Sequence, residues 1–149
     1  MLQRKQTLYL LTAIVLIIFN LINPFINSSE LIFDAFNLKQ LVGTAPVIIK
    51  TYPIAIYLII LSLLHLFTIF LLKGRPFQMR FAILSLILSI GFYGILFYYH
   101  YIANQQLTIE IHQYSFGLVT PLLAAVFDFM AYGGIKRDEK IVRDSERLR

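Results

Sequence analysis

The chain has 149 residues, of which 58% are hydrophobic and only 14% charged, and its mean hydropathy is +0.74. These values exclude an ordinary soluble domain and predict a single membrane domain over residues 1–149. The net charge of +5 does not indicate a nucleic-acid partner, because the basic residues sit just beyond the apolar stretches. Since the chain has no cysteine, disulfides, thiolate metal sites and a cysteine nucleophile are also excluded.

Four apolar stretches predict membrane-spanning helices. They cover residues 7–22, 54–72, 81–101 and 116–135. The first stretch follows a short basic start, but no small-x-small cleavage site follows it, so we expect an uncleaved span rather than a signal peptide. The second and third are separated only by a short basic turn and must run antiparallel. The expected fold is an all-α, antiparallel bundle of four transmembrane helices.

Two polar connections, residues 23–53 and 102–115, are expected on the outer face. The first contains two strand-like pieces, 31–38 and 47–52, with turn residues at 43–46 between them. In the second, residues 107–112 alternate apolar and polar side chains as a half-buried strand does. Because an isolated strand leaves its backbone unpaired, we predict a small outer β-sheet formed by both loops.

The distribution of positive charge predicts the orientation. Eleven of the thirteen lysines and arginines lie before the first span, between the second and third, or in the tail, residues 136–149. Such an excess marks the cytoplasmic side of a membrane protein. Both termini are therefore expected in the cytoplasm.

Four polar residues lie at similar depth within the four spans: Thr12, His65, Ser89 and Asp128. At ~1.5 Å rise per residue, Asp128 lies about 12 Å from the basic boundary at Lys136. An intramembrane carboxylate costs on the order of 2.5–3.5 kcal/mol, so Asp128 should face other helices or water, and its depth allows a pair with His65. Two interpretations stay open: these side chains join helices, or they serve a proton, ion or substrate path.

The tail combines charged pairs at four-residue spacing with one apolar face, which indicates a helix. It is either a solvated extension of the fourth span, with charge facing lipid, or a docking helix for a cytoplasmic partner. The residues expected to contact a protein or lipid are Arg137, Asp138, Glu139, Arg143, Arg147 and Arg149.

The sequence contains no catalytic constellation. It lacks GxSxG, HExxH and a phosphate-binding glycine loop, and His65 with Asp128 has no evident nucleophile. No metal site and no cofactor are predicted. We expect a non-enzymatic accessory or assembly subunit that contacts membrane lipids and a protein partner through its outer cap, its tail or both. The alternatives are a small transporter or proton-coupled channel using Asp128 and His65, and a lipid-binding or lipid-modifying protein that uses the basic rim.

The two ends of the chain, MLQRKQTLYLL and IKRDEKIVRDSERLR, resemble an uncharacterised bacterial family of four-helix integral membrane proteins, the domain-of-unknown-function family 4293. The resemblance runs end to end, and the tail is its most specific part. It implies a Bacteroidetes-type Gram-negative cell, hence the inner membrane and a periplasmic face for the two polar loops. It implies no activity, but it gives a contact through the tail more weight.

Overall fold

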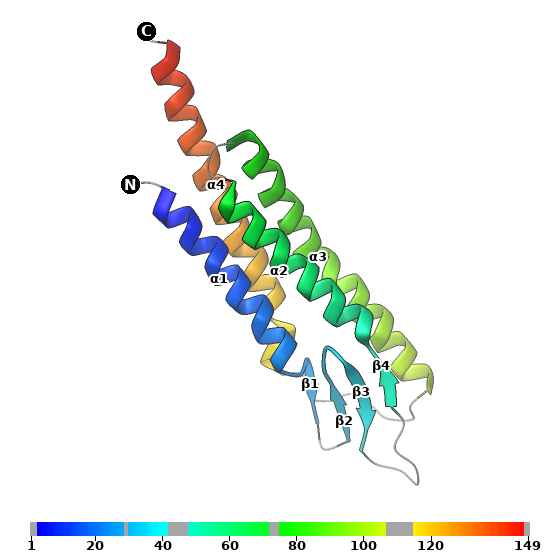
Figure 1. The fold of residues 1–149 in the computed structure, drawn as a ribbon. Helices are drawn as coiled ribbons and strands as arrows, with labels where there is room; N and C mark the ends of the chain where they lie inside the picture. Colours follow the sequence, from blue (N-terminus) through cyan, green and yellow to red (C-terminus); the bar gives the residue numbers. More distant parts are fainter. Residues whose placement is uncertain (1–2, 29, 42–47, 72–74, 107–114, 148–149) are drawn as a thin grey trace.

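Four long helices and a small sheet make up the fold, shown as a ribbon in Figure 1. The computed structural model describes residues 3–28, 30–41, 48–71, 75–106 and 115–147, with side chains in 5–28, 30–41, 48–71, 75–105 and 115–144. The helices are α1 (Gln3–Ile22), α2 (Tyr52–Phe70), α3 (Arg75–Gln106) and α4 (Thr120–Arg147), and a short 3-10 turn, η1 (Phe116–Leu118), precedes α4. The prediction of four long apolar helices is confirmed, and in length and composition each is able to cross a membrane.

The helices α1, α3 and α4 extend beyond the predicted spans. α3 has 32 residues where 81–101 were predicted, and α4 continues without a break into the tail. Hydropathy detects only the apolar part of a helix, whereas lysine, arginine and glutamine are good helix formers and let it continue. Pro76 is tolerated because it lies in the first turn of α3, where its missing N–H would have no helical partner. α3 is therefore about 48 Å long, more than the ~30 Å of a hydrocarbon core.

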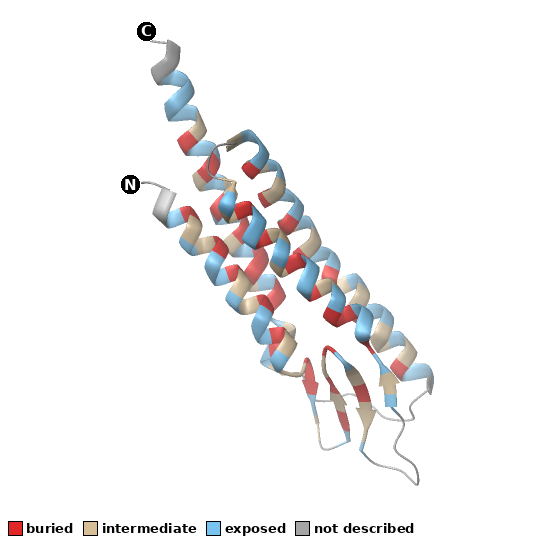
Figure 2. Ribbon diagram, in the orientation of Figure 1, coloured by how far each residue is buried: buried red, intermediate tan, exposed pale blue. Residues whose placement is uncertain are grey.

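A repeating spacing of four and three residues separates the buried positions in every helix. These positions are Gln6, Leu10, Ala13, Ile17 and Asn20 in α1; Ile54, Leu58, Leu61, His65 and Thr68 in α2; Gln78, Ala82, Ser85, Ser89, Phe92 and Leu96 in α3; and Ala124, Asp128, Ala131, Ile135 and Asp138 in α4. The seven-residue repeat is typical of helices that cross at about 20° with interlocking side chains. Figure 2 shows the exposed residues on the outer faces of the helices, and many of these are large and apolar, as lipid contact requires.

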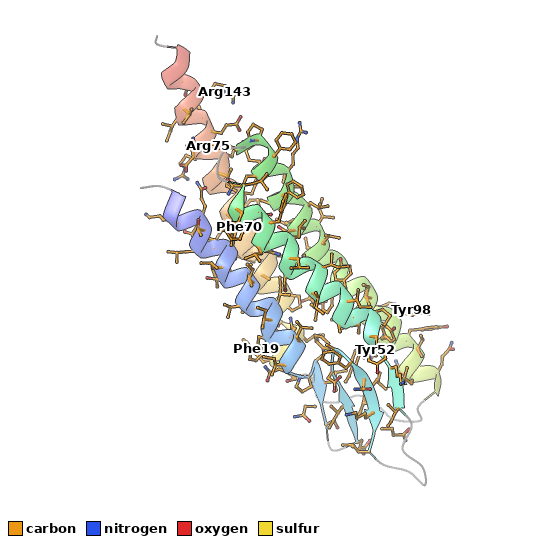
Figure 3. All side chains as sticks on the ribbon, in the orientation of Figure 1. Phe19, Tyr52, Phe70, Arg75, Tyr98 and Arg143 are labelled. Atoms are coloured by element: carbon orange, nitrogen blue, oxygen red, sulfur yellow. The ribbon has the colours of Figure 1, made fainter. Side chains whose placement is uncertain are left out.

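The helices form a closed ring in chain order, in which α4 packs against both α3 and α1. Both chain ends lie at one end of the bundle, here called the terminal end, and the sheet lies at the other, the sheet end (Figure 1). Figure 3 shows Tyr52 and Tyr98 near the sheet end and Arg75 and Arg143 at the terminal end. The cytoplasmic location of the terminal end stays a prediction.

The sheet contains four antiparallel strands in chain order: β1 (Ile26–Asn27), β2 (Leu31–Phe33), β3 (Asn37–Gln40) and β4 (Ile48–Lys50). The prediction of one strand over 31–38 is wrong, because Asp34 turns the chain. Its Oδ1 accepts hydrogen bonds from the backbone N–H groups of Phe36 (2.8 Å) and Asn37 (2.6 Å). This side-chain turn ends β2 and starts β3. In the described part of the predicted strand 47–52, the strand is Ile48–Lys50, and Tyr52 already begins α2.

One apolar face of the sheet covers the sheet end of the bundle. The inward side chains Leu31, Phe33 and Leu38 are at most 2% exposed. The ring of Phe25, which precedes β1, lies 5.5 Å from that of Phe33 and 5.7 Å from that of Phe92 on α3. These aromatic contacts fix the sheet to the helices.

All strands that the structure describes come from the first outer loop. The predicted strand 107–112 lies outside the described residues, so its place in a sheet shared by both loops stays a prediction. The end of the second loop does reach the edge of the sheet, because the Ser115 N–H donates to the Phe25 carbonyl oxygen (3.0 Å). Phe25 N in turn donates to Phe33 O (2.7 Å), which ties the entry to α4 to the first two strands.

Candidate functional site

The middle of the bundle holds a polar cluster, here called the middle layer, of His65 on α2, Ser89 on α3 and Asp128 on α4. His65 Nε2 lies 2.7 Å from Asp128 Oδ1, and the Ser89 hydroxyl donates to Asp128 Oδ2 at 3.2 Å. All three residues are fully buried. The carboxyl group of Asp128 therefore joins three helices at one level.

The middle layer contains one proton that two groups can hold. His65 Nδ1 lies 2.7 Å from the Leu61 carbonyl oxygen, which can only accept, so Nδ1 carries a hydrogen. The contact between Nε2 and Asp128 then needs one more proton, carried either by the imidazole or by the carboxyl group. In either arrangement His65 and Asp128 keep the hydrogen bonds to each other, to Leu61 and to Ser89, and the two side chains together carry no net charge. Neutrality favours burial, because a lone charge at this depth costs on the order of 2.5–3.5 kcal/mol.

Thr12, the fourth residue expected at this level, does not join the middle layer. Its side chain is exposed, and its hydroxyl donates to the Leu8 carbonyl oxygen of the same helix at 2.9 Å. The inward position on α1 belongs to its neighbour Ala13, which is fully buried. Depth along a helix follows from residue counting, but rotation about the helix axis does not.

A second cluster, the terminal layer, joins the helices at the terminal end. Gln6 Nε2 on α1 donates to Asp138 Oδ2 on α4 at 2.5 Å, and both residues are buried. Arg75 at the start of α3 donates to the Asp138 carbonyl oxygen at 3.0 Å. Gln78 Nε2 donates to the Thr68 carbonyl oxygen at 3.2 Å and so connects α3 with α2.

A third cluster lies at the other end and is called the sheet-end layer. The Thr120 hydroxyl, at the start of α4, lies 2.7 Å from Asn20 Oδ1 on α1 and 2.9 Å from the Gly117 carbonyl oxygen. Asn20 and Thr120 are buried, and Asn20 Nδ2 has no hydrogen-bond partner among the described residues. A Cβ at Gly117 would stand 2.6 Å from the Pro24 carbonyl oxygen, so only glycine fits this junction.

The helix α4 supplies a partner in every layer, namely Asp138, Asp128 and Thr120. Sequence reasoning found the middle layer and missed the other two. Gln6 and Asn20 are fourteen residues apart, two full seven-residue repeats, and this spacing places them on the same face as Leu10 and Ile17. The seven-residue repeat was thus the signal that could have found them.

The predicted tail contacts divide between the interior and the surface. Asp138 turns into the bundle, whereas Arg137 and Arg143 are exposed and Glu139 is half-buried. The side chain of Arg147 and the whole of Arg149 lie outside what the structure describes. The tail is a helical continuation of α4 at least to residue 147.

The comparisons with known proteins give a family and nothing further. A family model described as a domain of unknown function, DUF4293, matches residues 2–148. No curated protein and no solved structure matches the chain. The matched segment contains all four helices, the sheet, the three polar layers and most of the tail. The chain belongs to the DUF4293 family.

Proposed function

We propose that this protein is a non-enzymatic accessory or assembly subunit of the bacterial inner membrane that binds a protein partner through the projecting end of α4. The observation that carries the proposal is the continuation of α4 past the other helices at the terminal end (Figure 1). On this segment Ile141 and Val142 are 49% and 40% exposed among charged residues. An apolar pair on a charged helix beyond the bundle is a suitable anchor for another protein.

The interior of the bundle supports a structural role. Each of the three polar layers joins helices through its own hydrogen bonds, and the middle layer balances its charge internally. The middle layer also lacks the geometry of a catalytic triad. In a triad the histidine bridges the nucleophile and the acid, whereas here Asp128 bridges His65 and Ser89, so the imidazole does not contact the serine hydroxyl.

The basic terminal end supports a cytoplasmic position for the docking helix. It carries Lys5, Arg75 and Arg80 in addition to the cations of α4, whereas Lys39 and Lys50 are the described cations of the sheet. This asymmetry favours a cytoplasmic terminal end and a periplasmic sheet.

The test is a pull-down of the tagged protein from native membranes in mild detergent, comparing the wild type with Ile141→Gln/Val142→Gln. Glutamine preserves helix formation and removes the apolar contact. We expect a stoichiometric protein partner with the wild type and its loss with the double variant. Lys140→Gln, which changes a charge beside the pair, is the matched control and should retain the partner. A monomer without partner in every extract would refute the proposal.

A small transporter or proton-coupled channel is the second candidate, and the proton held between His65 and Asp128 favours it. Groups that pass a proton between them at this depth are found along proton paths. Asp128→Asn keeps the shape of the side chain and removes the second proton-holding site. If the middle layer carries protons, proteoliposomes with the wild type should show proton flux and those with Asp128→Asn should not. Equal flux with both proteins would exclude this role.

A further inference from the structure

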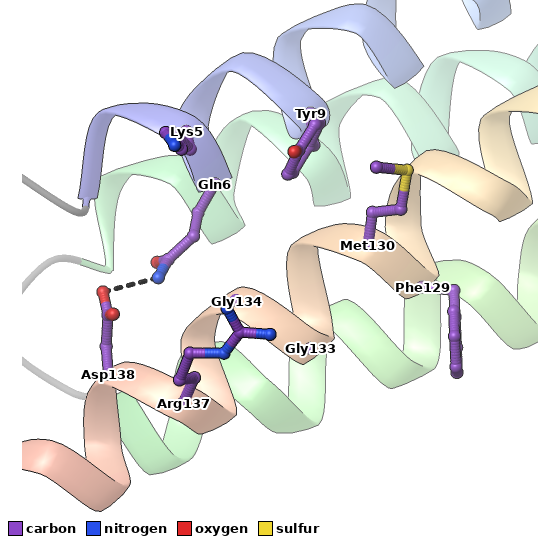
Figure 4. A pocket seen from close by; sticks show the side chains of 9 residues that line it. All are labelled: Lys5, Gln6, Tyr9, Phe129, Met130, Gly133, Gly134, Arg137 and Asp138. Carbon is purple, nitrogen blue, oxygen red and sulfur yellow. Dashed lines mark hydrogen bonds between the residues drawn. The ribbon is translucent and has the colours of Figure 1, made fainter.

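A groove of about 350 Å³ lies between α1 and α4 at the terminal end, shown in Figure 4. Its walls change character along the helix axis. Towards the middle of the bundle they are apolar and aromatic, with Tyr9, Phe129 and Met130. Towards the chain ends they carry two cations, Lys5 and Arg137. The groove thus has an apolar half and a cationic half.

Two adjacent glycines create the groove without separating the helices. A Cβ at Gly134 would stand 2.8 Å from Gln6 Cγ, so the glycine allows α4 to approach α1 closely here. A Cβ at Gly133 would meet no atom within 4 Å, so the space above this residue is open. Figure 4 shows Arg137 lying over these glycines, with its guanidinium directed back along α4.

The cations of the groove are available to a ligand. Within the described part of the chain, neither Lys5 nor Arg137 makes a hydrogen bond or ion pair through its side chain. The nearby carboxyl group of Asp138 already accepts a hydrogen bond from Gln6. With Lys5 and Arg137 positive and Asp138 negative, the cationic half carries a net charge of +1, which matches the single negative charge of a phosphodiester.

We propose that this groove binds one anionic glycerophospholipid. The phosphodiester lies between Lys5 and Arg137, and the upper part of one acyl chain lies against Tyr9, Phe129 and Met130. The dimensions agree, because the nine helical rises of α4 from Phe129 to Asp138 span about 13.5 Å, enough for a headgroup and the first carbons of a chain. Basic pockets between helices at the edge of the apolar zone are suited to such headgroups. This inference does not rest on the proposed accessory role.

A second groove, of about 510 Å³ between α3 and α4, provides an internal comparison. It shares Gly133 and Arg137 with the first and adds Lys136, Lys140 and Arg143, but Met79 is its one large apolar side chain. It therefore offers charge without a surface for an acyl chain. Lys5 lines only the first groove and Lys140 only the second, so the two lysines distinguish a built lipid site from general attraction to basic charge.

Native mass spectrometry of the detergent-purified protein tests the proposal by titration with dioleoyl phosphatidylglycerol and dioleoyl phosphatidylcholine, which have the same chains. We expect preferential retention of one phosphatidylglycerol per chain. Lys5→Gln should weaken that binding about fivefold, as expected for one surface cation near an anionic lipid, while Lys140→Gln should leave it unchanged. Gly133→Leu should fill the groove and reduce binding without lowering the unfolding temperature, because its side chain enters open space and leucine is the better helix former.

Four outcomes would overturn the proposal. Equal retention of both lipids would show that the headgroup charge does not contribute to binding. Equal losses of lipid binding with Lys5→Gln and Lys140→Gln would show that the lipid is held by general attraction to basic charge. Glycerol 3-phosphate has no acyl chain, and its competition at the same concentration as the lipid would indicate a phosphate site. A co-purified protein that protects the groove in place of lipid would indicate another occupant.

Discussion

Removing the two partners of the middle layer separately and together should reveal a strong coupling between α2 and α4. The variants are His65→Leu, Asp128→Ala and the double variant. Asp128 takes part in two hydrogen bonds, at 2.7 and 3.2 Å, in a fully buried site. Asp128→Ala leaves the imidazole and the Ser89 hydroxyl without that partner, and one unsatisfied buried group costs about 1–3 kcal/mol.

The other single variant, His65→Leu, measures the cost of an unpaired carboxyl group. In His65→Leu, Asp128 keeps only the hydrogen bond from Ser89, and a charged group at this depth costs on the order of 2.5–3.5 kcal/mol. The double variant removes both polar groups, so it should be more stable than the sum of the single effects predicts. We expect a coupling free energy of about 1–2 kcal/mol, at the upper end for interhelical hydrogen bonds in membrane proteins.

Asp128→Asn is the matched control for charge. Its side-chain NH₂ can donate to Nε2 of a neutral His65, and its oxygen can accept from Ser89, so no hydrogen bond of the middle layer is lost. We therefore expect a loss below about 1 kcal/mol. The free energy of unfolding is measured by SDS titration of the protein in mild detergent, followed by circular dichroism. Additive single effects, within about 0.5 kcal/mol, would show that the two side chains do not interact and would refute this account of the layer.

Three further substitutions test the close contacts. The free energy of unfolding should be about 0.5–1.5 kcal/mol lower for Gly134→Ala than for Gly133→Ala. Both substitutions gain the same helix propensity, but only the first, whose Cβ would stand 2.8 Å from the glutamine on α1, displaces a hydrogen-bonded side chain. Gly117→Ala should cost about 1–3 kcal/mol in the same assay, since its Cβ would stand 2.6 Å from the backbone oxygen of Pro24 and that backbone must move; an unchanged stability would contradict the packing at the start of α4. Asp34→Ala should speed hydrogen exchange at the two amides that donate to its carboxylate and cost about 1 kcal/mol; unchanged exchange would mean that the turn holds without this side chain.

The number of helices and the distribution of charge could be predicted from the sequence because they depend on local composition. Hydropathy over about twenty residues identifies a span, and residue counting puts His65, Ser89 and Asp128 at one level, where they meet in the structure. The helix ends could not be placed in this way. Where the chain leaves the apolar zone, good helix formers such as those after Ile135 continue the helix in water.

Rotation of the helices was the information that hydropathy lacked. In a soluble helix the polar face shows which side is buried, but lipid makes the outer face as apolar as the inner one. Thr12 was therefore placed at the right level, with no information on its facing, and its side chain is exposed, while Gln6 and Asn20 lie inside and were not expected there. The short strands posed a different problem, because a single side chain, Asp34, converts one predicted strand into two.

The dependence of all three polar layers on α4 has a consequence for how the chain is made. The ribosome synthesises α4 after the other three helices, so Gln6, Asn20 and His65 are made before any of their partners on α4. Until α4 packs, these three side chains lack their partners at three depths of the bundle, and an unpaired polar group in lipid is costly. Packing of α4 supplies all three partners together, and a shift of α4 by one helical turn, ~5.4 Å, would misalign all of them at once. The three polar layers are therefore completed only when α4 packs against the other helices.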